Sequence, residues 1–503
     1  MKKKSLLLLI IPLLILACSN QNTSSTFSSS ELINSSSDNT SSDISIISSS
    51  LNNSSSDQII SSSTIDVSSS SKKESSSLPP VKEGEYRINF NSILLVDEDN
   101  QSIPLTYDIP KDYLSFDHLS ETFNKSLALA AFAFVACAPF KDKVTETYTS
   151  FGFDNLVFSN EYEEEENKDT VLYVIGHKKL DNYDLVNISL SGYNYAKPWE
   201  NNLTIGKSGN HTGFQNGAMK ILPTIINYLK TYEDVENLKI FINGYSRSAA
   251  IGSVVSIMLM DANIVSKDNL YAYLFETPRS VDIKNNKEYK SIFNIINSGD
   301  LVTHVPPEEY GLKRVGQDIE LYNENTASLL SSFNDNLSLV SFTPIDENNV
   351  KCNNDIDFAN YLINYLLEPI ESADGSEVKD ISSRENYFNN EQQYITYLTG
   401  FFLGLSSSFI QTLIEEVSKL DNVGLLNLIV TDGLYNYLSP ILDKNNISYD
   451  KDALKESTNA LLVLIQHKRE LIKILSSETF RNNAMRTIYL HTLETVLPLL
   501  INL

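Results

Sequence analysis

One serine lies between an expected strand and an expected helix in the segment Lys239–Ser253, which reads KIFINGYSRSAAIGS. Gly244 and Ser248, two positions before and after Ser246, are small enough for the strand and the helix to approach each other around a tight turn. This spacing predicts a nucleophile elbow, a turn that holds its serine in strained backbone geometry. The backbone N–H of Arg247, the next residue, would then face an oxyanion formed at Ser246.

The usual pattern of such an elbow ends in glycine, where this chain has Ser248. Serine is also small, so the packing argument still applies. The motif alone is equally compatible with an ordinary strand-to-helix turn in which Ser246 caps the helix, because patterns this short also occur by chance. The interpretation therefore depends on partners elsewhere in the chain.

A serine nucleophile needs a base that removes its proton and an acid that orients the base. In α/β sheets with such an elbow, the chain order is serine, acid, histidine. Asp300 comes just after an expected strand and well after Ser246, so it suits the acid. The alternative is an aspartate that only caps its loop.

The base must come from one of six histidines, of which only His467 and His491 lie well beyond Asp300. His467 belongs to the charged stretch IQHKRE, where a solvated histidine is expected. His491 has apolar neighbours near the C-terminus, where a histidine buried in the core is the alternative. Its position after the acid favours His491 as the base, whereas His304 is too close to Asp300 in sequence to reach around it easily.

A second oxyanion donor is expected on the loop after the strand Tyr183–Leu190. Ser191 and Gly192 begin that loop, and a glycine lets backbone approach a ligand closely. A plain loop is equally compatible with these residues.

Strands alternate with helices between residues 170 and 300, which predicts an α/β fold, an α/β-hydrolase-like sheet flanked by helices. Working residues in such sheets lie on loops at the carboxyl ends of the strands. A hairpin over residues 85–110 and a buried helix over residues 127–140 are expected before the sheet. The other expected elements are strands at 171–175, 183–190, 240–242, 270–275 and 291–296, and helices at 214–232 and 249–260.

Beyond about Asp355, apolar residues recur at three- and four-residue spacing, so a mostly helical C-terminal region is expected. Such a region would suit a cap packed on the sheet domain. The stretches with this spacing are 361–367, 397–420, 452–475 and 485–500.

The charge of the chain excludes some partners. The 503 residues carry a formal net charge of −25, which argues against binding nucleic acid, because a nucleic-acid binder needs a basic face. The same charge repels anionic bilayers, so electrostatic attraction would not bring the protein to a membrane. Hydrophobic residues make up 42% of the chain, enough for a sizeable core.

The N-terminus is typical of a bacterial lipoprotein signal. Lys2, Lys3 and Lys4 precede an apolar run over residues 6–16 that is too short to span a bilayer, and Ala17-Cys18 follows. Cleavage before Cys18 would leave a lipidated N-terminal cysteine that anchors the chain to the outer face of the cytoplasmic membrane. A plain secretory signal and an uncleaved anchor fit Cys18 less well.

The composition then divides the chain. We expect a signal peptide (1–17), a lipidated cysteine with a Ser-rich disordered tether (18–80), an α/β-hydrolase-like domain (81–345) and a helical C-terminal region or cap (346–503). Cys137 and Cys352, the remaining cysteines, make no disulfide framework, and no Cys/His spacing indicates zinc. Neither a metal nor an organic cofactor is expected.

Six segments within residues 171–321 resemble the class 3 lipase family of α/β-hydrolases, and look closest to lipase-like proteins of low-GC Gram-positive bacteria. The segments are IGHKKLDNYD (175–184), LSGYN (190–194) with Trp199, GKSGNHTGF (206–214), NGYSRSA (243–249), FETPR (275–279), and IINSGDLV (295–302) with VPP (305–307).

The resemblance implies Ser246 as nucleophile, Asp300 as acid, and oxyanion donors at Arg247 N–H and Ser191 or Gly192. His211 falls in a family segment that is structural near the site. In the bacterial relatives the triad histidine precedes a Pro-Glu, and His491-Thr-Leu-Glu494 is similar but lacks the proline.

The sequence thus predicts a surface-anchored serine hydrolase that cleaves carboxylic esters, and the resemblance implies lipids as substrates. One alternative is a catalytically inactive surface lipoprotein that kept the fold for binding, since fold does not imply function. Another is a serine hydrolase that acts on acyl-peptide or polysaccharide esters. No oligomeric state is predicted.

Overall fold

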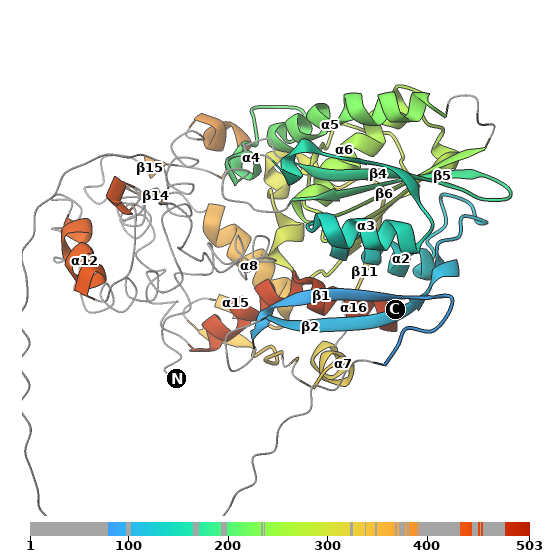
Figure 1. Cartoon of the computed structure of the whole chain (residues 1–503). Coiled ribbons are helices and arrows are strands. Elements are labelled where there is room, and N and C mark those ends of the chain that lie inside the picture. The colour runs from blue at the N-terminus through green and yellow to red at the C-terminus, as the bar shows by residue number, and fades with distance from the viewer. Residues whose placement is uncertain are drawn as a thin grey trace, which may run out of the picture. The chain divides into compact units, whose positions relative to one another are not determined.

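A seven-stranded, mostly parallel sheet forms the centre of the computed structural model (Figure 1). The strand order is β11-β9-β7-β6-β5-β4-β3, in which β5, β6, β7, β9 and β11 run parallel, and β3 and β4 complete one edge in antiparallel pairing. Along the chain these strands are β3 (Asp154–Phe158), β4 (Leu172–Lys179), β5 (Asp184–Ser191), β6 (Leu238–Tyr245), β7 (Leu270–Phe275), β9 (Ile292–Ile296) and β11 (Gln317–Glu320). This is the expected α/β-hydrolase-like sheet.

The structure describes most of the chain between residues 79 and 391 and the C-terminus, and residues 82–503 fall within one compact unit. The described residues are 79–96, 102–163, 171–192, 199–232, 235, 237–321, 325–335, 337, 339–347, 350–367, 370–371, 378–379, 382–389, 391, 433–444, 451–452, 454–455 and 478–503. The predicted signal peptide and nearly all of the predicted tether lie outside them, as do Cys18, His467 and the stretch 397–420. None of the helices in these ranges is long and apolar enough to cross a membrane.

Both faces of the sheet are buried, which explains why its central strands read as nearly continuous apolar runs. In β6, Phe241 packs in the core on one face, while Ile240 and Ile242 pack in the core on the other. All six residues of β7 are buried. The alternation of side chains along each strand therefore builds two separate cores.

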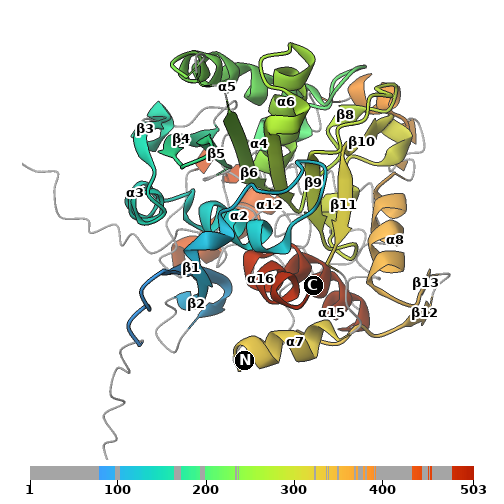
Figure 2. The same ribbon diagram turned by 90° about the vertical axis from the view of Figure 1, so that its right-hand side faces the viewer.

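Helices cover both faces, as expected of an α/β fold (Figures 1 and 2). On one face, α5 (Thr212–Lys230) and α6 (Arg247–Asp261) pack against the strands. On the other, α2 (Lys125–Cys137) is buried from Leu127 onward and packs with α3 (Lys141–Ser150). The expected buried helix at 127–140 is thus confirmed, with its end at Cys137.

The expected N-terminal hairpin is also present. Strands β1 (Glu85–Val96) and β2 (Ser102–Pro110) pair antiparallel, from Glu85 opposite Pro110 to Val96 opposite Ser102. Residues 97–101, which join the two strands, lie outside the described residues.

The C-terminal stretch at 485–500 differs from the single helical run that its spacing suggested. It forms the end of α15 (Glu478–Leu490) and most of α16 (Leu493–Asn502), with an interruption at His491 and Thr492. The interruption is stabilised because the hydroxyls of Thr492 and Thr495 both donate to the main-chain oxygen of Tyr489. Helix α16 then packs against α2 and β1 in the same core as the sheet. The predicted division of the chain at residue 345 stays a prediction.

The described residues form further helical elements. They are η1 (Lys111–Tyr113), η2 (Asn160–Tyr162), α4 (Trp199–Leu203), η3 (Lys267–Asn269), η4 (Leu301–His304), η5 (Glu308–Tyr310), α7 (Thr326–Phe333), α8 (Asp355–Leu367) and α12 (Gly433–Lys444). The short strands pair two by two, β8 (Val281–Asp282) with β10 (Leu312–Lys313), β12 (Ile345–Glu347) with β13 (Val350–Cys352), and β14 (Ile370–Glu371) with β15 (Val378–Lys379).

Candidate active site

Ser246 occupies the turn between β6 and α6 and has left-handed backbone angles, φ 56° and ψ −127°. A residue other than glycine rarely adopts a positive φ, so contacts around the turn must stabilise this conformation. Its N–H donates to the main-chain oxygen of Phe275 on β7 at 2.9 Å, and its own carbonyl accepts from Ala249 at 2.9 Å. Gly244 is required because a Cβ there would lie 2.8 Å from the main-chain oxygen of Ser248.

Ser248 replaces the usual glycine of the elbow without disturbing it. Its Oγ lies 3.1 Å from the main-chain oxygen of Leu190 on β5 and 2.7 Å from that of Tyr245, and it accepts from the Tyr245 N–H at 3.1 Å. The hydroxyl therefore fastens the start of α6 to the end of β6 and to the neighbouring strand. The departure from the pattern is compatible with the strained turn.

Asp300 follows β9 on a loop at the carboxyl end of the sheet, where the chain order predicted an acid. Its Oδ1 accepts from the Val302 N–H at 2.8 Å, so the carboxylate also caps the short helix η4. The alternative interpretation as a loop cap is thus correct for one oxygen, while Oδ2 stays available for a second partner. Gly299 lets this loop pass close to the C-terminal helices, because a Cβ there would lie 2.7 Å from Leu490 Cδ1.

His491 connects Asp300 to Ser246. Its Nδ1 lies 2.6 Å from Asp300 Oδ2, and its Nε2 lies 3.0 Å from Ser246 Oγ. All three side chains are buried, with relative exposures of 0% for His491 and Asp300 and 2% for Ser246. A proton on Nδ1 donated to the carboxylate leaves the Nε2 lone pair directed at the serine hydroxyl, which is the arrangement a general base needs.

Three of the other described histidines have structural partners elsewhere. His211 caps α5 by accepting from the Phe214 N–H, and burial, chiefly, lowers its pKa to about 3, so it is neutral. His177 lies between the carboxylates of Asp154 and Asp184. His304 donates through Nε2 to the main-chain oxygen of Ser298 at 2.8 Å and shapes the Asp300 loop. The sequence-based assignment of a structural role to His211 agrees with this geometry.

The predicted oxyanion donors follow the strand that neighbours β6. Ser189 of β5 pairs with Asn243 of β6 in parallel, and from this pair both strands run toward the same edge of the sheet, β5 to Ser191 and β6 to Tyr245. Ser191 and Gly192 are both buried at the carboxyl end of β5. Arg247 opens α6, which directs its backbone N–H toward the start of the helix.

Two residues beside the triad were missed by reasoning from sequence. Glu276, directly after β7, is fully buried next to Asp300 and has a positive φ of 48°. Tyr245 stacks its ring on the His491 imidazole with centroids 5.1 Å apart. Both belong to segments that carry the family resemblance, FETPR and NGYSRSA, but nothing in those letters indicates their partners.

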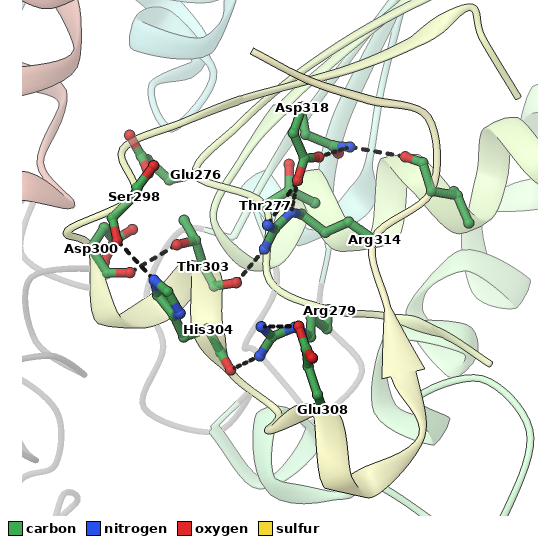
Figure 3. A network of polar contacts seen from close by, with 12 residues as sticks. Glu276, Thr277, Arg279, Ser298, Asp300, Thr303, His304, Glu308, Arg314 and Asp318 are labelled. Carbon is green, nitrogen blue, oxygen red and sulfur yellow. Dashed lines mark hydrogen bonds and ion pairs between the residues drawn. The ribbon is translucent and has the colours of Figure 1, made fainter. Parts of the chain in front are cut away.

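A polar network supports the Asp300 loop (Figure 3). Arg279 donates to the main-chain oxygens of His304 and Pro306, and Arg314 donates to that of Thr303 while pairing with Asp318 at 2.8 Å. Burial lowers the pKa of Arg279 from its ordinary value. The segment after Asp300 is therefore fixed by two arginines.

A family model matches part of the chain. Residues 183–310 match the family model described as lipase (class 3), a match that supports a lipase-like hydrolase with a serine triad. The matched segment contains Ser246 and Asp300, and it ends long before His491. No match was found among curated proteins.

Several solved structures of fungal lipases are similar to the chain at low identity. A fungal lipase–inhibitor complex is 14% identical, with a TM-score of 0.34 over 40% of this chain and 81% of that one. A deletion mutant of the Rhizomucor miehei lipase propeptide complex is 13% identical, with a TM-score of 0.32 over 40% of this chain and 67% of that one. The lipase of Rhizopus microsporus var. chinensis is 17% identical, with a TM-score of 0.30 over 43% of this chain and 82% of that one.

Proposed function

We propose that the protein is a serine hydrolase that cleaves carboxylic esters, with lipid esters as its substrate class. The observation that carries the proposal is the continuous pair of contacts from Asp300 through His491 to Ser246, at 2.6 and 3.0 Å. The match of residues 183–310 to class 3 lipases supports lipid as the substrate class. In this proposal Ser246, His491 and Asp300 are the catalytic residues.

The proposed reaction runs in two halves. Ser246 Oγ attacks the ester carbonyl while His491 Nε2 takes the hydroxyl proton, and Asp300 holds the imidazole in the tautomer that can accept it. The tetrahedral intermediate collapses, the C–O bond of the ester breaks, and the imidazolium returns the proton to the departing alcohol. Water then attacks the acyl-serine by the same route, which releases the carboxylic acid and restores Ser246.

The oxyanion of each tetrahedral intermediate would receive N–H donors from Arg247 and from the Ser191–Gly192 turn. Donors of this kind are typically worth about 3 kcal/mol each in a site that excludes water. The burial of Ser246, at 2% exposure, favours exclusion of water. It also means that an ester can reach Oγ only after residues that cover the serine move aside.

We further propose that the protein acts at the cell surface of a bacterium. The basis is the N-terminal sequence, in which a lipidated Cys18 would hold the chain on the outer face of the cytoplasmic membrane and the Ser-rich segment to residue 80 would act as a tether. Incorporation of labelled palmitate and recovery in the membrane fraction would both be lost in Cys18→Ala. The matched control Ser19→Ala should retain both, and equal labelling of the two variants would contradict the anchor.

The test of the nucleophile is labelling of the purified full chain with a fluorophosphonate probe. We expect labelling of the wild type and none of Ser246→Ala. Ser253→Ala is the matched control, because Ser253 is a buried serine on α6, the helix that follows Ser246. Cooperative unfolding of each variant shows that it is folded.

The test of the base compares His491→Gln with His177→Gln, which changes a histidine held between Asp154 and Asp184. The first should lower the labelling rate by at least about a hundredfold, the usual contribution of a general base, and the second should not. A folded wild type that does not label would instead favour the catalytically inactive binding protein. Hydrolysis of polysaccharide or acyl-peptide esters in preference to emulsified glycerides would assign another substrate class.

A further inference from the structure

Glu276 is a fully buried carboxyl group beside the triad acid, and its position is set by the sheet. Its backbone N–H donates to Ile295 on β9 at 2.9 Å, which places the residue at the joint ends of β7 and β9, where the Asp300 loop begins. One carboxyl oxygen of Glu276, one of Asp300 and one ring nitrogen of His491 all lie within 4.8 Å of one another. Figure 3 shows Glu276 beside Ser298 and Asp300.

The two oxygens of Glu276 have different surroundings. Oε2 accepts from the backbone N–H of Asn297 at 3.0 Å. Oε1 is buried, and no donor from the described part of the chain reaches it. A carboxylate would therefore keep one oxygen desolvated without compensation, which is costly, whereas a carboxylic acid can use that oxygen as a donor.

The neighbouring carboxylate of Asp300 is the acceptor for this proton, because its negative charge favours a protonated Glu276. Burial, first, and the negative charge of Asp300, second, raise the pKa of Glu276 well above its ordinary value of 4.5. Two carboxylates this close cannot both ionise without mutual repulsion, so they share one proton. Asp300 is the partner that faces His491 at 2.6 Å, so the proton belongs on Glu276.

We propose that Glu276 is a positioning residue of the triad: as a neutral carboxylic acid it donates a hydrogen bond to Asp300 and holds that carboxylate against His491. The inference rests on the proposed function in so far as it assigns Asp300 a catalytic role. The proton on Glu276 does not depend on that role. The left-handed backbone at Glu276, at φ 48°, fits a residue retained for its side chain, since glycine would adopt this conformation without strain.

A bound cation is the other way to compensate adjacent carboxylates, and the His491–Asp300 distance argues against it. Two ligands of one zinc ion, each about 2.1 Å from the metal in tetrahedral geometry, lie about 3.4 Å apart. Nδ1 and Oδ2 are 2.6 Å apart, the separation of a direct hydrogen bond with a proton between them. A proton compensates the charge with no such conflict.

The charged groups that face Glu276 are Asp300 and His491, which are the charges that shift its pKa. Other nearby charges are paired elsewhere. His304 is bonded to Ser298, and Asp355, on the other side of Gly299, is bonded to Arg486 at 2.6 Å. A pH effect at Glu276 can therefore be assigned to the triad.

The first experiment compares the pH dependence of fluorophosphonate labelling of the full chain in the wild type, Glu276→Gln and Glu276→Leu. Glutamine can accept from Asn297 and donate to Asp300, so the labelling rate of Glu276→Gln should fall by no more than about threefold. Leucine can do neither, so the labelling rate of Glu276→Leu should fall by at least about tenfold at neutral pH. Rescue by glutamine but not leucine identifies the hydrogen bond, and equal losses in both variants would overturn it.

The acid limb of the same profiles reports whether Glu276 carries a charge. If Glu276 is already neutral, the acid midpoint in Glu276→Gln stays within about 0.3 pH units of that in the wild type. If Glu276 were ionised, glutamine would remove a negative charge beside the imidazole and lower the midpoint by about one unit or more. A shift of that size would overturn the proposal.

The second experiment needs no reactive serine, so it separates failure of this inference from failure of the proposed function. Unfolded Glu276 loses its proton near pH 4.5, but the folded protein keeps it, so wild-type stability should fall as pH rises above 4.5. Glutamine does not titrate. The unfolding constant of the wild type relative to Glu276→Gln should therefore rise by up to tenfold per pH unit between pH 5 and 8. A ratio that is constant with pH would overturn the neutral acid, even if the enzyme is active.

Discussion

The hydroxyl of Tyr245 donates a hydrogen bond to the main-chain oxygen of His491, and the tyrosine ring stacks on the imidazole at an interplanar angle of 29°. Tyr245, the residue before the nucleophile, therefore holds His491, the residue that contacts the nucleophile. Because His491 lies in the break between α15 and α16, this contact fixes a position that no regular helix fixes.

Replacement of Tyr245 by phenylalanine should keep the stacking and remove the hydrogen bond. We expect a loss of about 1 kcal/mol in the free energy of unfolding. The labelling rate should fall roughly tenfold, because small displacements of a base are costly. Tyr273→Phe is the matched control, since the Tyr273 hydroxyl accepts from the Asn124 N–H at the start of α2, 3.0 Å away. Similar rate losses in both variants would show that the effect is one of stability alone.

The elbow makes a second prediction, which compares two of its glycines. A Cβ at residue 244 would lie 2.8 Å from the main-chain oxygen of Ser248, whereas one at residue 252 would meet the side chain of Leu274 at 3.0 Å. Main-chain atoms cannot move aside for an added methyl group as the end of a leucine side chain can. We therefore expect Gly244→Ala to cost about 3 kcal/mol and to abolish labelling, and Gly252→Ala to cost about 1 kcal/mol and to retain it. Urea unfolding and labelling of the two variants test this, and a reversed order would contradict the packing argument.

Much of the sheet could be predicted because burial on both faces leaves a direct mark on the sequence. The strand Leu270–Phe275 was expected with the bounds it has, since all six residues are apolar and buried. Helix α6 was expected because small residues follow Ser246, and its close contacts require them. Local pattern and tertiary environment point the same way in these elements.

The site was only partly predictable because its contacts join distant segments. His491 could be selected by its order after Asp300, but its contact with Ser246 depends on a helix break that periodicity did not indicate. The proton of Glu276 depends on how the ends of β7 and β9 meet, and a single glutamate in FETPR carries no trace of that environment. Spacing along one element shows which residues share a face, but it does not show what another element brings to it.

The buried ion pair between Asp355 and Arg486 makes a third prediction. The pair joins α8 to α15 at 2.6 Å, with both side chains almost fully buried, and it lies shortly before the His491 break. Arg486→Met should cost about 3–5 kcal/mol because it leaves the Asp355 charge without this partner in a buried site. The double variant Asp355→Leu/Arg486→Met should recover most of that loss.

Urea unfolding of the two variants measures this difference. The control is Lys267→Met, which removes an exposed ion pair with Glu121 at 3.4 Å and should cost less than about 1 kcal/mol. A double variant that is no more stable than Arg486→Met would show that the loss arises from packing and not from the unpaired carboxylate.

His211, the buried N-cap of α5, makes stability depend on pH in the direction opposite to the effect of Glu276. Burial, chiefly, lowers the pKa of His211 from 6.5 to about 3. At mildly acidic pH, His211 therefore binds a proton in the unfolded chain but not in the folded chain. Stability is therefore complete above pH 6.5 and is lost as the pH falls from there toward 3. Between pH 6.5 and 5 the loss should be about 2 kcal/mol.

His211→Asn keeps a side chain that can cap α5 but does not titrate, so the difference in unfolding free energy between wild type and variant should shrink by that amount over this interval. A difference that is the same at both pH values would mean that the native state accommodates a charged His211.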